Sequence, residues 1–67
     1  MDDFRTALLE WKEKRRLLSR EIGELLDPPA SPATVSSWMT GSAEPKKGHR
    51  GQLVKLSRGI IKPRHFL

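Results

Sequence analysis

The fold is decided by residues 31–41, SPATVSSWMTG, which carry the strongest helix signals of the chain. Ser31 can cap the first turn, and Pro32 stands at the first helical position, where its missing N–H breaks no hydrogen bond. Val35 and Trp38 are three residues apart, so they should face the core together. The glycine that ends the stretch allows the chain to leave the helix sharply. The sequence therefore predicts a short, firmly anchored helix here.

Other helices are predicted on both sides of this stretch. Asp2 or Asp3 can cap a first helix, Ser19 can cap a second, and the two prolines after Asp27 must end the second. Ile60 and Ile61 are expected to form a short extended piece. No alternating strand pattern is found, so we expect an all-α fold, a small orthogonal bundle of four to five helices in one domain, residues 1–67. The further helices are predicted at 3–16, from 19 or 20 to 26, from about 49 to 58, and as a final turn opened by Pro63.

Several side chains are given a structural role by their spacing. Both tryptophans, Trp11 and Trp38, are expected in the core. The second helix should bury an apolar side, and His49 should lie at the surface. Gly23 lies inside a predicted helix, where glycine costs about 1 kcal/mol against alanine, so a close crossing is expected there. The apolar side of the second helix is predicted to consist of Ile22, Leu25 and Leu26, with Leu18 packing just ahead of the helix.

Composition excludes several classes of protein. The chain has 67 residues and no cysteine, so it can form no disulfide and no thiolate metal site. The two histidines, His49 and His65, lack nearby acidic partners, so no metal, cofactor or small-molecule substrate is expected. No nucleophile–base pair or phosphate-cradling loop is found, so we expect no enzyme. The acidic start and the absence of about 18 consecutive apolar residues predict a soluble, cytoplasmic protein, in a bacterial cytosol or nucleoid, with no membrane partner.

The positive charge is concentrated in one half of the chain. Residues 1–30 carry six Lys or Arg and seven Asp or Glu, whereas residues 31–67 carry seven Lys or Arg and a single acid, Glu44. The first half therefore has a net charge of −1 and the second half one of +6, which together give the net charge of +5. Such an imbalance favours a polyanionic partner, although a merely solubilising surface would give the same composition.

The order of special residues resembles the Cro and repressor family of phage and bacterial helix-turn-helix regulators. The matching segments are Leu18-Ser19-Arg20-Glu21-Ile22-Gly23 and Thr34-Val35-Ser36-Ser37-Trp38-Met39-Thr40-Gly41, followed by Pro45; the tail from Leu56 to Phe66 is also similar. The chain departs from the family at two places. Gly23 stands where the family usually has alanine, and the turn around residues 27–30 is about two residues longer than usual.

The resemblance implies that the helix starting at Ser31 enters the major groove of double-stranded DNA, and that the protein regulates transcription as a repressor. The strong bidentate readers Arg, Asn and Gln are missing, so readout would rely on hydroxyl groups, thymine methyl contacts and DNA shape. Phosphate contacts are expected from nearby cations, above all those of residues 46–51. The predicted DNA-binding residues are Arg20, Ser31, Pro32, Ala33, Thr34, Ser36, Ser37, Thr40, Lys46, Lys47 and Arg50.

The family also implies a homodimer, at least on DNA, because its members bind two half-sites. The surplus apolar residues of the C-terminal segment are candidates for a dimer surface. They could instead close the core over the first helix. A protein-interaction module of the same fold, such as an antitoxin or a phage protein that binds a host protein, is the alternative function. The candidate dimer residues are Ile60, Ile61, Phe66 and Leu67.

Overall fold

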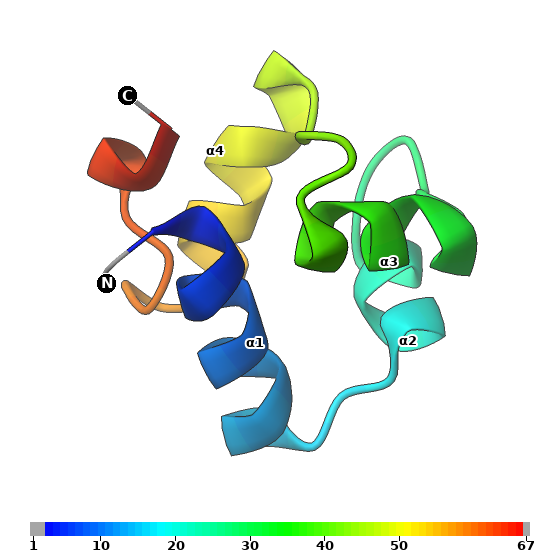
Figure 1. The fold of residues 1–67 in the computed structure, drawn as a ribbon, viewed down its shortest axis with the longest axis horizontal. Helices are drawn as coiled ribbons and strands as arrows, with labels where there is room; N and C mark the ends of the chain where they lie inside the picture. Colours follow the sequence, from blue (N-terminus) through cyan, green and yellow to red (C-terminus); the bar gives the residue numbers. More distant parts are fainter. Residues whose placement is uncertain (1–2, 67) are drawn as a thin grey trace.

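The computed structural model describes residues 3–66, and within this range it holds helices and no strand. The predicted all-α class is confirmed. The elements are α1 (Phe4–Arg15), α2 (Ser19–Glu24), α3 (Pro32–Thr40), α4 (Lys47–Leu56) and a final 3₁₀ turn, η1 (Pro63–Phe66). They pack into a bundle in which α2 and α3 lie side by side, while η1 lies against α1 and α4 (Figure 1).

The helix starts follow the predicted capping chemistry except at α2. The carboxylate of Asp3 accepts a hydrogen bond from the backbone N–H of Thr6 at 2.9 Å, so Asp3 caps α1 as expected. At α2 the cap is Leu18 and not Ser19. The Glu21 side chain accepts the Leu18 N–H at 2.8 Å. This single bond is the Glu half of a capping box, since the leucine side chain can accept none in return.

The boundaries of α2 and α4 differ from the predicted ones, and two leucines are exposed as a result. α2 ends at Glu24, so Leu25 is its C-cap. Leu25 and the N-cap Leu18 are exposed, contrary to the prediction, whereas Ile22 and Leu26 are buried in the core. α4 begins about two residues earlier than predicted, at Lys47. Residues 60–61 form a bend and not the predicted extended piece.

The connection between α2 and α3 passes close to Gly23. The longer loop folds back over α2, where the Ala30 N–H donates to the Gly23 carbonyl at 3.0 Å. A Cβ at position 23 would overlap the backbone carbonyl oxygen of Ala30, with Val35 behind it. The close approach predicted at Gly23 is therefore present, but the neighbour is the loop rather than the next helix. The extra residues and the glycine depend on each other.

The core is built around both tryptophans, as predicted. Trp11 and Trp38 are nearly inaccessible, and the helices converge on them. Ser57 is also buried; its hydroxyl accepts the Ile61 N–H at 2.9 Å and ties the chain after α4 to the bundle. The buried apolar residues are Phe4, Ala7, Leu8, Trp11, Ile22, Leu26, Val35, Trp38, Leu53 and Ile61.

The C-terminal segment closes the core, which removes most of the predicted dimer surface. Ile61 is fully buried, and Phe66 stacks on Phe4 with ring centroids 4.9 Å apart. Ile60 is half-buried and packs against the same core. Leu67 lies outside the described residues. Of the two readings of this segment, the structure therefore supports closure over α1, because a core this small needs these side chains.

Candidate nucleic-acid interface

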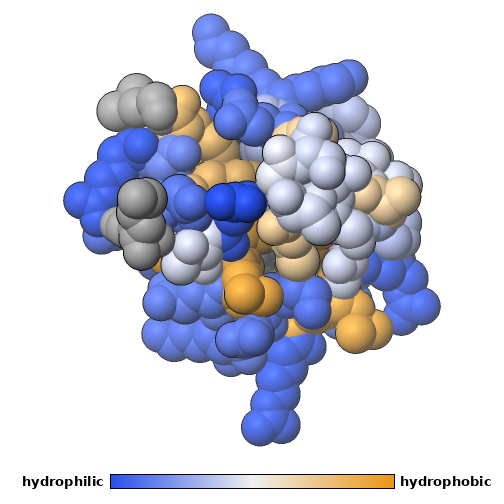
Figure 2. Space-filling view, viewed as in Figure 1, coloured by the Kyte–Doolittle hydropathy of each residue, from blue (hydrophilic) through white to orange (hydrophobic). Residues whose placement is uncertain are grey.

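The outer face of α3 is exposed and uncharged. Ser31 caps the helix, because its hydroxyl oxygen accepts the Thr34 N–H at 3.2 Å. Pro32, Ala33 and Ser36 are exposed, while Val35 and Trp38 hold the opposite face in the core. In Figure 2 this face is a pale area of neutral hydropathy between strongly hydrophilic groups. A helix held in this way presents small side chains without a charged group.

The hydroxyl groups of this face differ in whether they already form hydrogen bonds within the protein. Ser37 is half-buried, and its hydroxyl donates to the Ala33 carbonyl at 3.0 Å. Thr40 likewise donates to the Ser37 carbonyl at 3.2 Å. Both oxygens can still accept a hydrogen bond from a partner, but their protons are engaged. Ser36 is exposed, and its hydroxyl has no hydrogen-bond partner among the described residues. Among the serine and threonine side chains of the predicted set, Ser36 is therefore the one most available to form a hydrogen bond with a partner.

A hollow beside α3 brings part of the predicted set together. Its lining includes Ser31 and Thr34 at the start of α3, Lys46 at the start of α4, and the carboxylate of Glu44. The hydroxyls of Ser31 and Thr34 lie 2.9 Å apart and share a hydrogen bond. The segments 31–34 and 46–49, separated in sequence, thus form one edge of the molecule. A chain of phosphates running past the start of α3 would meet a lysine there.

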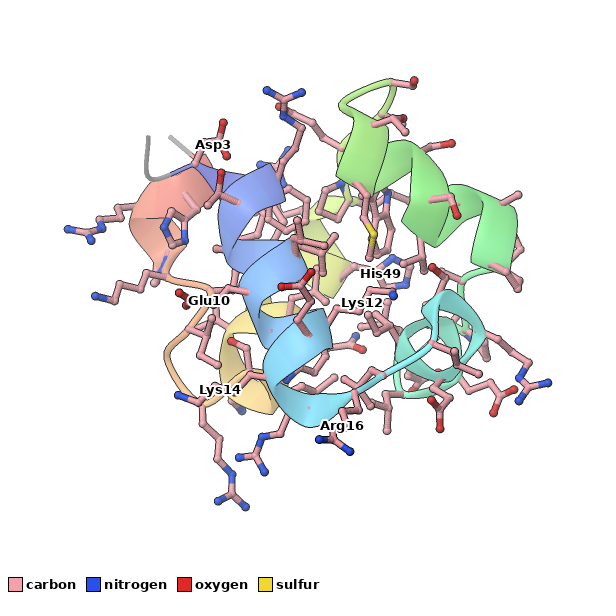
Figure 3. The ribbon with its side chains drawn as sticks, turned by 60° about the horizontal axis from the view of Figure 1, so that its bottom comes forward. Asp3, Glu10, Lys12, Lys14, Arg16 and His49 are labelled. Carbon is pink, nitrogen blue, oxygen red and sulfur yellow. The ribbon has the colours of Figure 1, made fainter. Side chains whose placement is uncertain are left out.

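His49 supports this edge from within, contrary to the predicted surface position. Its side chain is buried between α3 and α4, as Figure 3 shows, with its ring 5.9 Å from that of Trp38. Its Nε2 lies 2.7 Å from the Pro28 carbonyl oxygen, which can only accept, so Nε2 carries the proton. This bond fixes the loop that leads into α3. No residue pattern indicates this role, because the partner is a backbone oxygen of the loop between α2 and α3.

The predicted phosphate contacts fall into two groups. Lys46 and Lys47 are exposed and take part in no ion pair of the described structure. Arg20 lies 3.8 Å from Glu24, with both side chains about two-thirds exposed, so this weak pair can yield to a phosphate. Lys46 and Lys47 are therefore available to contact a phosphate, and Arg20 is available once its weak pair with Glu24 opens.

Arg50 is partly exposed, but its side chain contacts three other residues of the fold. Its Nε donates to the Pro45 carbonyl at 3.0 Å, and its guanidinium lies over the Phe66 ring and 3.7 Å from a carboxylate oxygen of Glu44. It therefore fastens the turn before α4 to the C-terminal segment. A phosphate would have to compete with these partners for the guanidinium.

The described residues, 3–66, contain no group of three or more His, Asp or Glu side chains able to hold a metal ion. No helix in this part of the chain is both long and apolar enough to cross a bilayer. Comparison with family models, curated proteins and solved structures found no match to this chain.

Proposed function

We propose that this protein binds double-stranded DNA sequence-specifically and regulates transcription, with α3 in the major groove. The observation that carries the proposal is the outer face of α3, which is exposed, uncharged and rich in hydroxyls, while its inner face is locked by Val35 and Trp38. A major groove admits a helix, and small side chains let the helix backbone approach the base edges closely.

The distribution of charge supports the same placement. α3 itself carries no carboxylate. The hollow at its N-terminal end is lined by the exposed Lys46 and by one carboxylate, that of Glu44, which lies 3.7 Å from the Arg50 guanidinium. Lys47 follows in the first turn of α4. Cations beside an uncharged reading helix supply affinity through counterion release, while the helix supplies sequence preference.

We propose further that two copies act together on DNA as a repressor. A single α3 of this length reaches few base pairs, and paired half-sites are the usual solution. With Ile61 and Phe66 committed to the core, the copies would meet through DNA or through a surface other than the C-terminal segment.

The proposal is tested by selecting bound duplexes from a random library. An enriched motif is expected, and a symmetric motif if two copies bind. Ser36→Glu should abolish binding and leave the circular dichroism spectrum unchanged, because Ser36 is exposed and its hydroxyl has no partner in the described structure. A library without enrichment, or wild-type binding by Ser36→Glu, would contradict the placement of α3.

The phosphate contacts are tested separately by the salt dependence of binding. Each phosphate neutralised contributes about 0.9 to the slope of log K against log salt, so replacing both Lys46 and Lys47 by alanine should reduce the slope by about 2. Lys14→Ala is the matched control, because this exposed lysine lies on α1, away from α3 in Figure 3. An equal change in the control would show that only net charge matters.

A further inference from the structure

A second surface, which we call the leucine patch, lies where α1, α2 and α4 end. Two adjoining hollows share Leu25 and Leu56, and Leu17 and Trp11 line one of them. No residue of α3 lines either hollow. In Figure 3 the labelled Arg16, at the end of α1, lies on the lower side of the molecule, far from α3. The leucine patch is therefore separate from the proposed DNA face.

The charged side chains around the leucine patch are all cations. Arg15 and Arg58 line one hollow, and Lys55 lines the other, whereas no carboxylate lines either. None of these three takes part in an ion pair of the described structure.

We propose that the leucine patch docks an acidic amphipathic helix of another protein. The leucines would receive the apolar face of that helix, and the three cations would pair with the carboxylates flanking it. A second copy of this chain fits less well, because a two-fold contact would bring the same cations together. A bare phosphate backbone would leave the leucines in water, and a flat bilayer would not fill the hollows. The proposal does not depend on DNA binding.

The test uses a synthetic peptide of about 16 residues that carries leucines at helical spacing and glutamates elsewhere. Fluorescence anisotropy should show binding, and Leu25→Gln should weaken it about tenfold through the lost apolar contact. Lys55→Glu should weaken it similarly and should gain affinity for a peptide in which lysines replace the glutamates. The matched control is Leu9→Gln, because Leu9 is 47% exposed against 49% for Leu25 but borders Glu10 and Glu13.

Several results would overturn the proposal. The acidic peptide could fail to bind at millimolar concentration, or Leu9→Gln could weaken binding as much as Leu25→Gln does. Binding of anionic phosphatidylglycerol vesicles, or of duplex DNA, that is lost in Leu25→Gln would assign the surface to another partner. Concentration-dependent dimerisation that Leu25→Gln abolishes would assign it to a second copy. Circular dichroism of each variant checks that the fold is retained; Leu25 is exposed, so its replacement should leave the core intact.

Discussion

Replacing Gly23 by alanine separates local helix preference from the packing of this fold. Gly23 lies within α2, where alanine is ordinarily the better residue by about 1 kcal/mol. Helix propensity alone therefore predicts that Gly23→Ala stabilises the protein. The structure predicts the opposite sign, because the added methyl group would overlap the carbonyl oxygen of Ala30.

The expected magnitude follows from what must move. The obstacle is backbone rather than a flexible side chain, so the whole loop before α3 has to shift. Overpacking of this kind costs about 1–3 kcal/mol. The hydrogen bond from the Ala30 N–H to the Gly23 carbonyl would weaken or break, at a further cost of about 1 kcal/mol. Set against the propensity gain, the net loss in the free energy of unfolding is about 1–3 kcal/mol.

The assay is thermal and urea unfolding followed by circular dichroism, with Gly51→Ala as the control. Gly51 also lies inside a helix, α4, but a Cβ there meets nothing within 4 Å. Gly51→Ala should therefore raise stability by up to about 1 kcal/mol, whereas Gly23→Ala should lower the Tm by about 10 °C. If both variants were stabilised alike, the loop would not lie against α2 as described, and the account of the long turn would be refuted.

Three further predictions concern the core and the caps. Trp38→Ala should lower the free energy of unfolding by about 3–5 kcal/mol, so circular dichroism should show an unfolded domain. A variant that stays folded and loses only DNA binding would show that the tryptophan is a contact residue instead. His49→Phe keeps a ring beside Trp38 but loses the hydrogen bond to the Pro28 carbonyl, so urea unfolding should show a free energy of unfolding lower by about 1–2 kcal/mol. An unchanged unfolding midpoint would show that this hydrogen bond does not stabilise the fold. The backbone N–H of Thr6 bonded to the Asp3 carboxylate lowers the pKa of that group below its ordinary value of 3.8, so its contribution to stability is present above that pH and is lost as the pH falls further, through the lower folded-state pKa. Asp3→Asn keeps a cap without this titration, so its Tm relative to wild type should rise between about pH 6 and about pH 2; a constant difference would contradict the assignment.

Much of the fold was predictable because local signals and packing agree. Around α3 a capping serine, a proline at the first position and a closing glycine coincide with helical spacing of Val35 and Trp38, so both boundaries and the buried face were predicted. α2 is short and its signals conflict. Ser19 was the better cap by residue type, but a bond from Leu18 to Glu21 moves the start by one residue.

The exposed side chains of the candidate site could be predicted from the sequence, but most of the contacts that hold the site in place could not. That the face of α3 would be small and uncharged follows from its periodicity alone. The bond from the Ser37 hydroxyl to the Ala33 carbonyl lies within α3 and is one that serine commonly makes in a helix, so it could be expected from the sequence. The bond from Arg50 to the Pro45 carbonyl instead depends on how the turn before α4 folds. The same holds for His49, whose partner lies on the lengthened loop. Contacts to the backbone across a loop are set by the tertiary path of the chain, so they appear only in three dimensions.

The central claim, that the outer face of α3 reads DNA, is tested most directly by a ¹⁵N chemical-shift titration with a duplex selected from the random library. The account predicts that the largest amide shifts fall on residues 31–37 and 46–47, with residues 9–14 of α1 unaffected. Shifts confined to the leucine patch, or an unshifted α3 under saturating duplex, would contradict it.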